Sequence, residues 1–286
     1  MKHSKLFKVF FFVLALVATE RFCRSQTDGF RLTKAINSYS YSFKDREQVT
    51  PQEVFQSFHF FGSGVQFYVF VGEDQKTILK LFKHHHMGPS TGFIKKYLPD
   101  ALTKSIVQKR EKRMHHLFTS VAIAHNELPQ ETGVFYTHLS KTNNQLGTIP
   151  LYDPLGICHQ VDLDRAEFLL QKRAIPLAQY LDPLFKNGCI DQAISAMKGI
   201  LTLIECRSEM GIKKKDGKVC ENCGYIGPLP AEIDIGSYVI RSRSTCKNPH
   251  KKTRLKATLG LLLWVKKHYP ENLKECHEKL LDENLL

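Results

Sequence analysis

Three short β-rich runs near the start of the chain limit its fold more than any other feature. Phe55–Phe61 and Val65–Val71 are rich in aromatic and β-branched side chains, and Gly62-Ser63-Gly64 joins them, which is a hairpin signal. Gly72-Glu73-Asp74-Gln75-Lys76 then leads to a third run, Thr77–Lys83, because glycine and aspartate favour turns. We therefore predict that a meander of three antiparallel strands opens the fold.

Lys80 is the one charged residue within the apolar run Ile78–Phe82. On a strand it shares its face with Ile78 and Phe82, while its two neighbours occupy the other face. Because both faces are apolar, we expect the ammonium to lie in covered space, where it needs an anionic partner or a shifted pKa. A nucleotide phosphate or a helix glutamate would serve; the alternative is an edge strand on which Lys80 reaches solvent.

Helical periodicity dominates the second half of the chain. Apolar residues recur about every 3.6 positions in Leu102–Leu128 and in Ile190–Met210, and Gly211 ends the second of these helices. A β-rich half followed by a helical half indicates an α+β, two-lobed plan. The other predicted elements are strands at Gly133–Leu139, within Thr148–Val161, at Ala166–Leu170 and at Ala231–Gly236, an irregular loop over 212–230, and helices at Thr253–His268 and Glu271–Asp282.

The charge balance favours anionic partners. The 286 residues include 41 lysines and arginines against 28 aspartates and glutamates, a formal net charge of +13. Such an excess suits phosphates, nucleic acid or an acidic membrane surface. The basic residues are spread along the chain, which is typical of a solvated surface, so we do not expect nucleic acid to be the partner.

The first 25 residues have the pattern of an export signal. Lys2, Lys5 and Lys8 precede the apolar run Val9–Ala18, which is much shorter than the roughly twenty apolar residues that a membrane span needs. We expect cleavage after Ser25 and a secreted, periplasmic or luminal protein. The alternative is an uncleaved signal that tethers the chain to a membrane.

Asp234 and the upstream pair Asp216 and Asn222 could complete a site for a nucleotide triphosphate and its metal. Asp234 lies at the end of a predicted apolar strand, where a carboxylate can hold Mg²⁺ against phosphates. Asp216 and Asn222 follow the helix Ile190–Met210. A carboxylate there can act as a base toward an acceptor hydroxyl, and an amide oxygen can bind the metal. For the aspartates the alternative is an ordinary turn or strand end.

These residues resemble the protein kinase-like superfamily over roughly residues 55–240. Phe61-Gly62-Ser63-Gly64 looks like the glycine-rich loop, and Ile78-Leu79-Lys80 looks like the strand that carries the nucleotide lysine. Asp216 and Asn222 take the places of the catalytic aspartate and the metal-binding asparagine. Asp234, followed by Ile235 and Gly236, stands where the Asp-Phe-Gly motif would be.

The resemblance implies a two-lobed kinase-like fold with ATP and Mg²⁺ as cofactors. After a lead-in at 26–47, an N-lobe with an antiparallel sheet and one helix would occupy 48–173, and a mainly helical C-lobe 174–286. The implied partners are a nucleotide and an unidentified hydroxyl-bearing or anionic acceptor. The implied site residues are Gly62, Ser63, Gly64 and Lys80 at the nucleotide, Asn222 and Asp234 at the metal, and Asp216 in catalysis.

Some features depart from the family pattern. No His-Arg-Asp precedes the loop, and Asn222 lies six residues after Asp216, one more than usual. Glu111, Glu127 and Glu131 compete as the helix glutamate that would pair with Lys80. The short C-terminal part is closer to small atypical kinases of sugars or lipids than to protein kinases. A pseudokinase or a non-enzymatic binding scaffold with a basic surface is the alternative function.

Cysteine and histidine provide a rival signal. Cys220-Glu221-Asn222-Cys223 could supply half a zinc site or a redox pair, so a zinc-binding or nucleic-acid-binding protein is the third hypothesis. Of the eight cysteines, seven remain after Cys23 leaves with the signal. Because an odd number cannot form a complete disulfide framework, we expect incidental cysteines. We expect His84-His85-His86 to be a solvated strand end.

Overall fold

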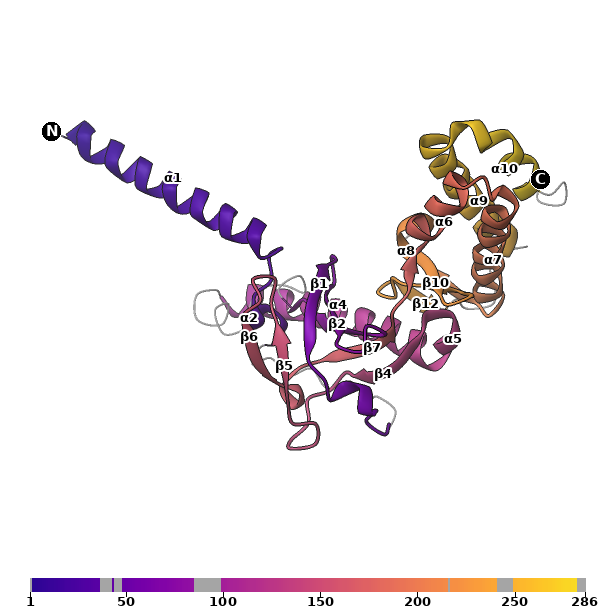
Figure 1. Cartoon of the computed structure of the whole chain (residues 1–286). Helices are drawn as coiled ribbons and strands as arrows, with labels where there is room; N and C mark the ends of the chain where they lie inside the picture. The colour runs from indigo at the N-terminus through magenta and orange to yellow at the C-terminus, as the bar shows by residue number, and fades with distance from the viewer. Residues whose placement is uncertain are drawn as a thin grey trace. The chain divides into compact units, whose positions relative to one another are not determined.

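A computed structural model describes residues 2–36, 43, 48–84, 99–215, 217–240 and 249–281 (Figure 1). The chain divides into two compact units. The first comprises Met1–Glu111 and His138–Leu170, and the second comprises Lys112–Thr137 and Gln171–Leu286. The fold is α+β, with a mixed sheet.

The sheet of the first unit is built on the predicted meander. Strands β1 (Phe58–Ser63), β2 (Phe67–Gly72) and β3 (Thr77–Phe82) pair antiparallel in sequence order, which confirms that prediction. β5 (Thr148–Tyr152) joins β1 in parallel and pairs antiparallel with β6 (Cys158–Asp162). Within this unit the strands follow the order β7-β3-β2-β1-β5-β6, so β3 is an interior strand. The strand β7 spans Phe168–Lys172.

The turn of the first hairpin lies later than predicted. Gly62 and Ser63 belong to β1, which has a register shift between Phe60 and Gly62. The N–H of Gly64 donates to the carbonyl of Phe67 at 2.9 Å. The chain therefore reverses between these two residues, because the bulge lets β1 run on through the glycine and serine.

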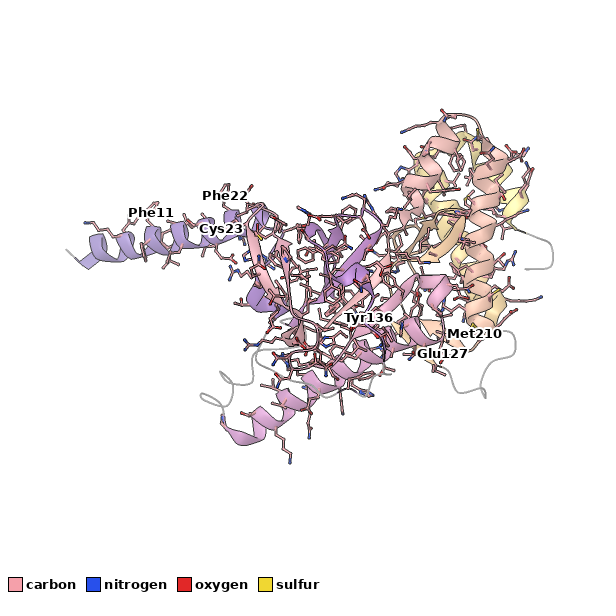
Figure 2. The ribbon with its side chains drawn as sticks, turned by 60° about the horizontal axis from the view of Figure 1, so that its bottom comes forward. Phe11, Phe22, Cys23, Glu127, Tyr136 and Met210 are labelled. Atoms are coloured by element: carbon pink, nitrogen blue, oxygen red, sulfur yellow. The ribbon has the colours of Figure 1, made fainter. Side chains whose placement is uncertain are left out.

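Helix α1 (Lys2–Gln26) carries exposed apolar side chains along its length. Figure 2 shows Phe11 and Phe22 on this helix, and both are more than half exposed. Among the described residues, no helix combines the length and the apolarity that crossing a bilayer requires. Whether α1 serves as an export signal remains a prediction.

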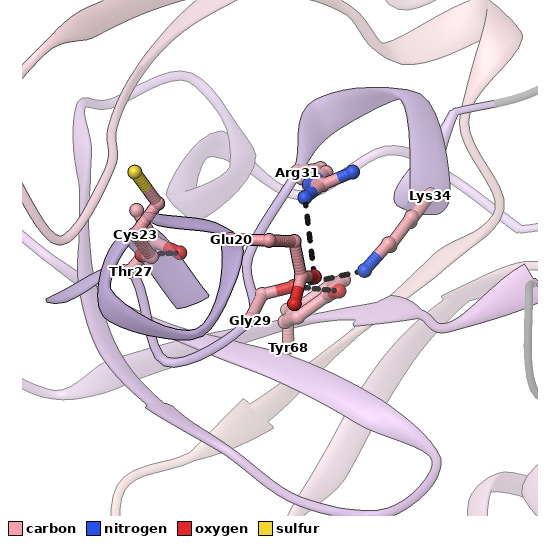
Figure 3. A network of polar contacts seen from close by, with 7 residues as sticks. All are labelled: Glu20, Cys23, Thr27, Gly29, Arg31, Lys34 and Tyr68. Carbon is pink, nitrogen blue, oxygen red and sulfur yellow. Dashed lines mark hydrogen bonds and ion pairs between the residues drawn. The ribbon is translucent and has the colours of Figure 1, made fainter. Parts of the chain in front are cut away.

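The end of α1 is tied to the sheet of the first unit through a compact polar network (Figure 3). Tyr68 donates from its hydroxyl to the carbonyl of Gly29 at 2.9 Å, and Arg31 lies 3.7 Å from Glu20. Phe30 is buried, and its ring lies 5.0 Å from that of Tyr68 in a T-shaped arrangement. A short helix, α2 (Leu32–Ala35), follows. The predicted extended lead-in is therefore wrong for this stretch, because one aromatic anchor buried on the sheet folds the chain locally.

The helices of the second unit enclose its apolar core. The longest are α4 (Asp100–Asn126), whose second half belongs to this unit, α7 (Ile190–Glu209) and α9 (Pro249–His268). Helix α7 packs on α9 and ends before Gly211, which has a φ of +77°. The smaller elements are α5 (Pro129–Thr132), β4 (Val134–His138), α6 (Leu177–Lys186), the 3₁₀ turn Pro270–Asn272 and α10 (Leu273–Leu280).

The segment 212–230 is not the irregular loop that the sequence predicts. It contains β9 (Ile212–Lys214), α8 (Val219–Asn222), β10 (Cys223–Ile226) and the start of β11 (Leu229–Glu232). These strands have only three or four residues, which is too few to show alternation. Two small sheets result, β11-β10-β8 and β12-β9, in which β8 is Ile175–Pro176 and β12 is Tyr238–Ile240. The predicted strand Ala231–Gly236 accordingly ends at Glu232.

Candidate functional site

Lys80 lies in the interior of the first unit's sheet. Every residue of β3 is buried, and only 5% of Lys80 is exposed. Because β2 and β7 flank β3, the edge-strand alternative is wrong and the expectation of a covered ammonium is confirmed. The ammonium lies 5.7 Å from the centre of the Phe67 ring, a distance at which a cation and an aromatic face attract each other.

The ammonium of Lys83, the residue after β3, lies against the turn between β1 and β2, a contact that the sequence did not predict. The ammonium donates to the hydroxyl of Ser63 at 2.5 Å and to the carbonyl of Gly64 at 2.6 Å. It also lies 4.4 Å from the centre of the Tyr68 ring, and burial lowers its pKa. The N–H of Gly64 donates to the carbonyl of Phe67. The turn predicted to bind a nucleotide therefore already uses these polar groups within the fold, with Lys83 and with β2.

Asn222 and Asp234 come together in the second unit. The backbone carbonyl of Asn222, the last residue of α8, accepts from the N–H of Ile233 at 2.8 Å and from that of Asp234 at 3.4 Å. Asp234 follows the end of β11 by two residues, and its carboxylate accepts from the N–H of Gly236 at 3.3 Å. An amide side chain and a carboxylate, both of which carry oxygens suited to Mg²⁺, thus belong to two segments that contact each other.

Two side chains without any sequence motif hold the Asp234 loop. Ser120 on α4 donates to the carbonyl of Ile235 at 2.5 Å and accepts from the N–H of Tyr238 at 2.6 Å. Gln171 donates to the carbonyl of Thr132 at 2.6 Å and lies 3.4 Å from that of Ile233. The backbone on both sides of Asp234 is therefore fixed by groups from distant parts of the sequence.

A buried charge network lies directly before this loop. Arg207 on α7 donates to the carboxylate of Glu232 at 3.2 Å and to the carbonyl of Ile212 at 2.9 Å. The hydroxyl of Tyr238 donates to the same carboxylate. Burial first, and then the negative charge of Glu232, raise the pKa of Tyr238 well above its usual value. These groups anchor β9, β11 and β12 to α7, so they position the backbone that carries Asp234.

The remaining predicted site residues are only partly placed. Asp216 lies outside the described residues, so its catalytic role stays a prediction. Of the three glutamates proposed as partners for Lys80, Glu111 belongs to the same unit as the lysine. Glu127 follows the end of α4 (Figure 2), and Glu131 lies in α5; both belong to the second unit.

The Cys220 and Cys223 thiols are poor candidates for metal or redox chemistry. Both are free thiols, and burial raises the pKa of each to about 12. Burial thus disfavours the thiolate on which zinc binding and thiol exchange depend. Within the described part of the chain, no group of three or more histidine, cysteine or acidic side chains could hold a metal ion. Cys246 lies outside that part.

His84 is buried, so the prediction of a solvated strand end is wrong for this residue. Its Nε2 lies 3.0 Å from Oε2 of Glu167, and each side chain is at most 2% exposed. A buried imidazole needs a polar partner, and the carboxylate of Glu167 provides one in the interior of the first unit. His85 and His86 lie outside the described residues.

Comparisons with known proteins give little further information. No protein-family model matches the chain, and no curated protein matches it. Among solved structures, the bifunctional kinase-methyltransferase WbdD aligns with 77% of this chain and 44% of its own, at 13% identity and a TM-score of 0.36. The chain thus spans less than half of that protein. At such a low TM-score the likeness to a kinase-like fold is loose and carries no argument about function.

Proposed function

We propose that the protein transfers the γ-phosphoryl group of ATP, as its Mg²⁺ complex, to a hydroxyl acceptor. One observation supports this more than any other: the carbonyl of Asn222 accepts from the N–H of Ile233 and Asp234. This backbone contact brings together two segments that carry an amide side chain and a carboxylate, groups whose oxygens suit a hard cation. The loop that carries the carboxylate is held by Ser120 and Gln171, and preorganised ligands cost less to order when the ion binds.

Each proposed role fits the chemistry of its side chain. Asn222 and Asp234 would hold Mg²⁺, and the ion would neutralise charge on the transferred phosphoryl group. Lys80 would neutralise nucleotide phosphates, which would provide a buried ammonium with the anion that it needs. Asp216 would accept the proton of the acceptor hydroxyl. Catalysis of this kind depends on position and electrostatic stabilisation rather than on a covalent intermediate.

A second candidate function, a non-enzymatic scaffold of the pseudokinase type, is favoured by the hairpin turn. The N–H of Gly64 bonds Phe67, and Lys83 bonds Ser63 and the carbonyl of Gly64. A turn that satisfies its own polar groups offers fewer donors to a phosphate. In this case the loop at Asp234 would stabilise the fold, and the protein would not hydrolyse or transfer a nucleotide phosphate.

Two substitutions with matched controls distinguish these functions. Lys80→Met and Asp234→Asn keep the size of the side chain but remove the charge, whereas Lys76→Met and Asp191→Asn change exposed residues of the same types. For the transferase, Mg·ATP raises the melting temperature of the wild type and of both controls, but not that of either site variant. If millimolar Mg·ATP leaves the wild-type melting temperature unchanged, the scaffold is supported and the transferase is rejected.

We also propose that residues 1–25 direct export, on the basis of the basic and apolar pattern of α1. An uncleaved helix would instead tether the chain to a membrane. Mass spectrometry of the protein expressed in a secreting host checks this. A mature N-terminus near Gln26 in the exported fraction is the expected result, and an intact chain that stays in the cytosol contradicts export.

A further inference from the structure

The second unit contains a cavity of about 570 Å³ that involves α7, α8, α9, β9 and β12. Its lining includes apolar side chains from three of these elements, Ile204, Val219 and Ala257, which belong to the buried core. The volume falls in the range of roughly 300–1,000 Å³ that is usual for small-molecule sites. The cavity can therefore hold a molecule of about nucleotide size, with an apolar wall for a ring or a carbon chain.

Basic side chains dominate the polar part of the lining. Among the described residues, six lysines and one arginine line the cavity, against one carboxylate, that of Glu232. Arg207 pairs with this carboxylate, so the described part of the lining has a large excess of positive charge. The six are Lys213, Lys214, Lys215, Lys218, Lys252 and Lys256. Such a concave cluster of one sign raises the local concentration of anions.

Two buried donors in the lining have no hydrogen-bond partner among the described residues: Nζ of Lys214 and Nδ2 of Asn222. The Lys214 ammonium lies 5.6 Å from the centre of the Tyr238 ring, which offsets only part of the cost of its burial. A buried donor without an acceptor is costly, more so when it is charged. An acceptor group from a ligand would remove this cost for both residues.

Lys256 adds a third donor at the loop before α8. A Cβ added at Gly217 would lie 3.0 Å from its Nζ, so the ammonium packs against the backbone of this loop. Other lysines of the lining have partners: Lys215 contacts His116 at 3.2 Å, and Lys218 pairs with Glu221 at 2.9 Å. Of the other four, Lys214 has a buried ammonium without a hydrogen bond among the described residues, and Lys256 lies against the loop before α8, so we take these two as the main cations for a ligand.

We propose that this cavity binds a small phosphorylated molecule, with its phosphate oxygens on Lys214, Lys256 and Asn222 and its remaining part on the apolar wall. A concave site of this volume suits such a molecule better than nucleic acid, which needs an extended surface along many phosphates. Asn222 also belongs to the proposed metal site, but its side-chain oxygen would bind Mg²⁺ there, whereas its Nδ2 donates to the ligand here. Because binding in the cavity requires neither Mg²⁺ nor phosphoryl transfer, the inference goes beyond the function proposed above and holds for a scaffold as well.

Calorimetric titration of the full chain with inorganic tripolyphosphate, in EDTA and at low salt, tests this inference. We expect one tripolyphosphate per chain in the wild type. Lys256→Met and Lys214→Met should each weaken binding about tenfold, because each removes a hydrogen bond to an ionised group. Lys266→Met and Lys267→Met, exposed lysines on the same helix α9 but outside the cavity, should leave binding unchanged.

The outcomes separate this site from the proposed nucleotide site. Lys80→Met and Asp234→Asn should keep full tripolyphosphate affinity even where they abolish binding of Mg·ATP. No heat of binding in the wild type, or equal losses in the cavity and control variants, would overturn the inference. Tighter binding of a DNA duplex than of tripolyphosphate would also overturn it. If Lys214→Met does not fold, Lys256→Met decides alone, since Lys256 is exposed.

Discussion

The two units treat buried lysines in opposite ways. In the first, Lys83 donates to Ser63 and Gly64 and lies over the Tyr68 ring, so its charge is used within the fold. In the second, the ammonium of Lys214 is buried with no hydrogen-bond partner among the described residues. A satisfied buried charge indicates a structural role, whereas an unsatisfied one indicates a place for a ligand.

The first unit also contains a buried carboxylate, that of Asp164, whose hydrogen bonds all come from within the fold. Asp164 accepts hydrogen bonds from the hydroxyl of Thr142 and from the N–H of Gln145, Leu146 and Gly147. Burial alone would raise the pKa of this carboxyl group, but these donors lower it to about 2. In the second unit Asn222 is also buried, but its Nδ2 has no hydrogen-bond partner among the described residues. Because this donor and the ammonium of Lys214 line the same cavity, the cavity is a suitable place to look for a ligand.

The largest loss of stability is expected within the second unit, at the buried ion pair of Arg207 and Glu232. These two side chains satisfy each other, unlike the two unbonded donors in the same cavity lining. Glu232→Gln leaves the buried guanidinium without its counter-charge. We expect a loss of about 3–5 kcal/mol in the free energy of unfolding, measured by chemical denaturation. Glu221→Gln, in the exposed pair with Lys218, is the control and should change stability by less than about 1 kcal/mol. Similar losses in the two variants would show that the buried pair is not an anchor.

The pH dependence of stability tests the structural role of the hydrogen-bonded carboxylate of Asp164 in the first unit. Its folded-state pKa is about 2, below the usual 3.8, so the stabilisation is complete above pH 5 and is lost as pH falls through 2. Asp164→Asn should therefore cost about 2 kcal/mol at pH 7 and progressively less as the solution is acidified. Urea denaturation at a series of pH values measures this. A cost that stays constant from pH 7 to pH 2 would contradict the assigned hydrogen bonds.

The most direct way to break the comparison is to remove the two lysines in turn. Lys83→Met loses charged hydrogen bonds to Ser63 and Gly64, and we expect it to cost about 1–2 kcal/mol. Lys214→Met removes a buried ammonium without a hydrogen bond, so we expect it to leave the ligand-free protein equally stable or slightly more stable. Thermal denaturation without added anions compares them. If Lys214→Met is as destabilising as Lys83→Met, the two lysines play the same structural role.

The smallest effect is expected at an exposed ion pair. Lys186 and Asp182 lie 2.5 Å apart on α6, at positions i and i+4, with side chains well exposed. Lys186→Met should change the free energy of unfolding by less than about 0.5 kcal/mol, and added salt should reduce even that. A loss above about 1 kcal/mol would mean that exposure does not separate weak from strong charge pairs in this chain.

The sequence predicted those helices and strands that have a regular pattern within their own residues. β1 to β3 carry β-rich runs with glycine-containing turns, α7 carries a long helical period, and the burial of Lys80 follows from apolar residues on both faces of its strand. The short strands β9, β10 and β12 could not be predicted, and only the end of β11 was. Each has three or four residues, and tertiary contacts decide such segments.

The polar contacts around the candidate site were also beyond prediction. Lys83 bonds a residue 20 positions away, and Ser120 bonds the backbone of Tyr238, which is 118 positions away. Single polar residues of this kind carry no periodicity and no motif, so only the fold brings them to their partners. The contact of Lys83 with the hairpin turn is the clearest example. Lys80 and Lys83 are three positions apart, and residues at an odd spacing along a strand direction point to opposite faces.

Calorimetric titration with ATP, carried out in Mg²⁺ and again in EDTA, tests the proposed nucleotide site most directly. The predicted result is that the wild type binds ATP at least about tenfold more tightly in Mg²⁺, and that Asp234→Asn removes this difference while it retains the fold and the affinity for tripolyphosphate. Equal affinity for ATP in Mg²⁺ and EDTA, or the same Mg²⁺ dependence in the wild type and Asp234→Asn, would contradict the assignment of Asp234 as a metal ligand.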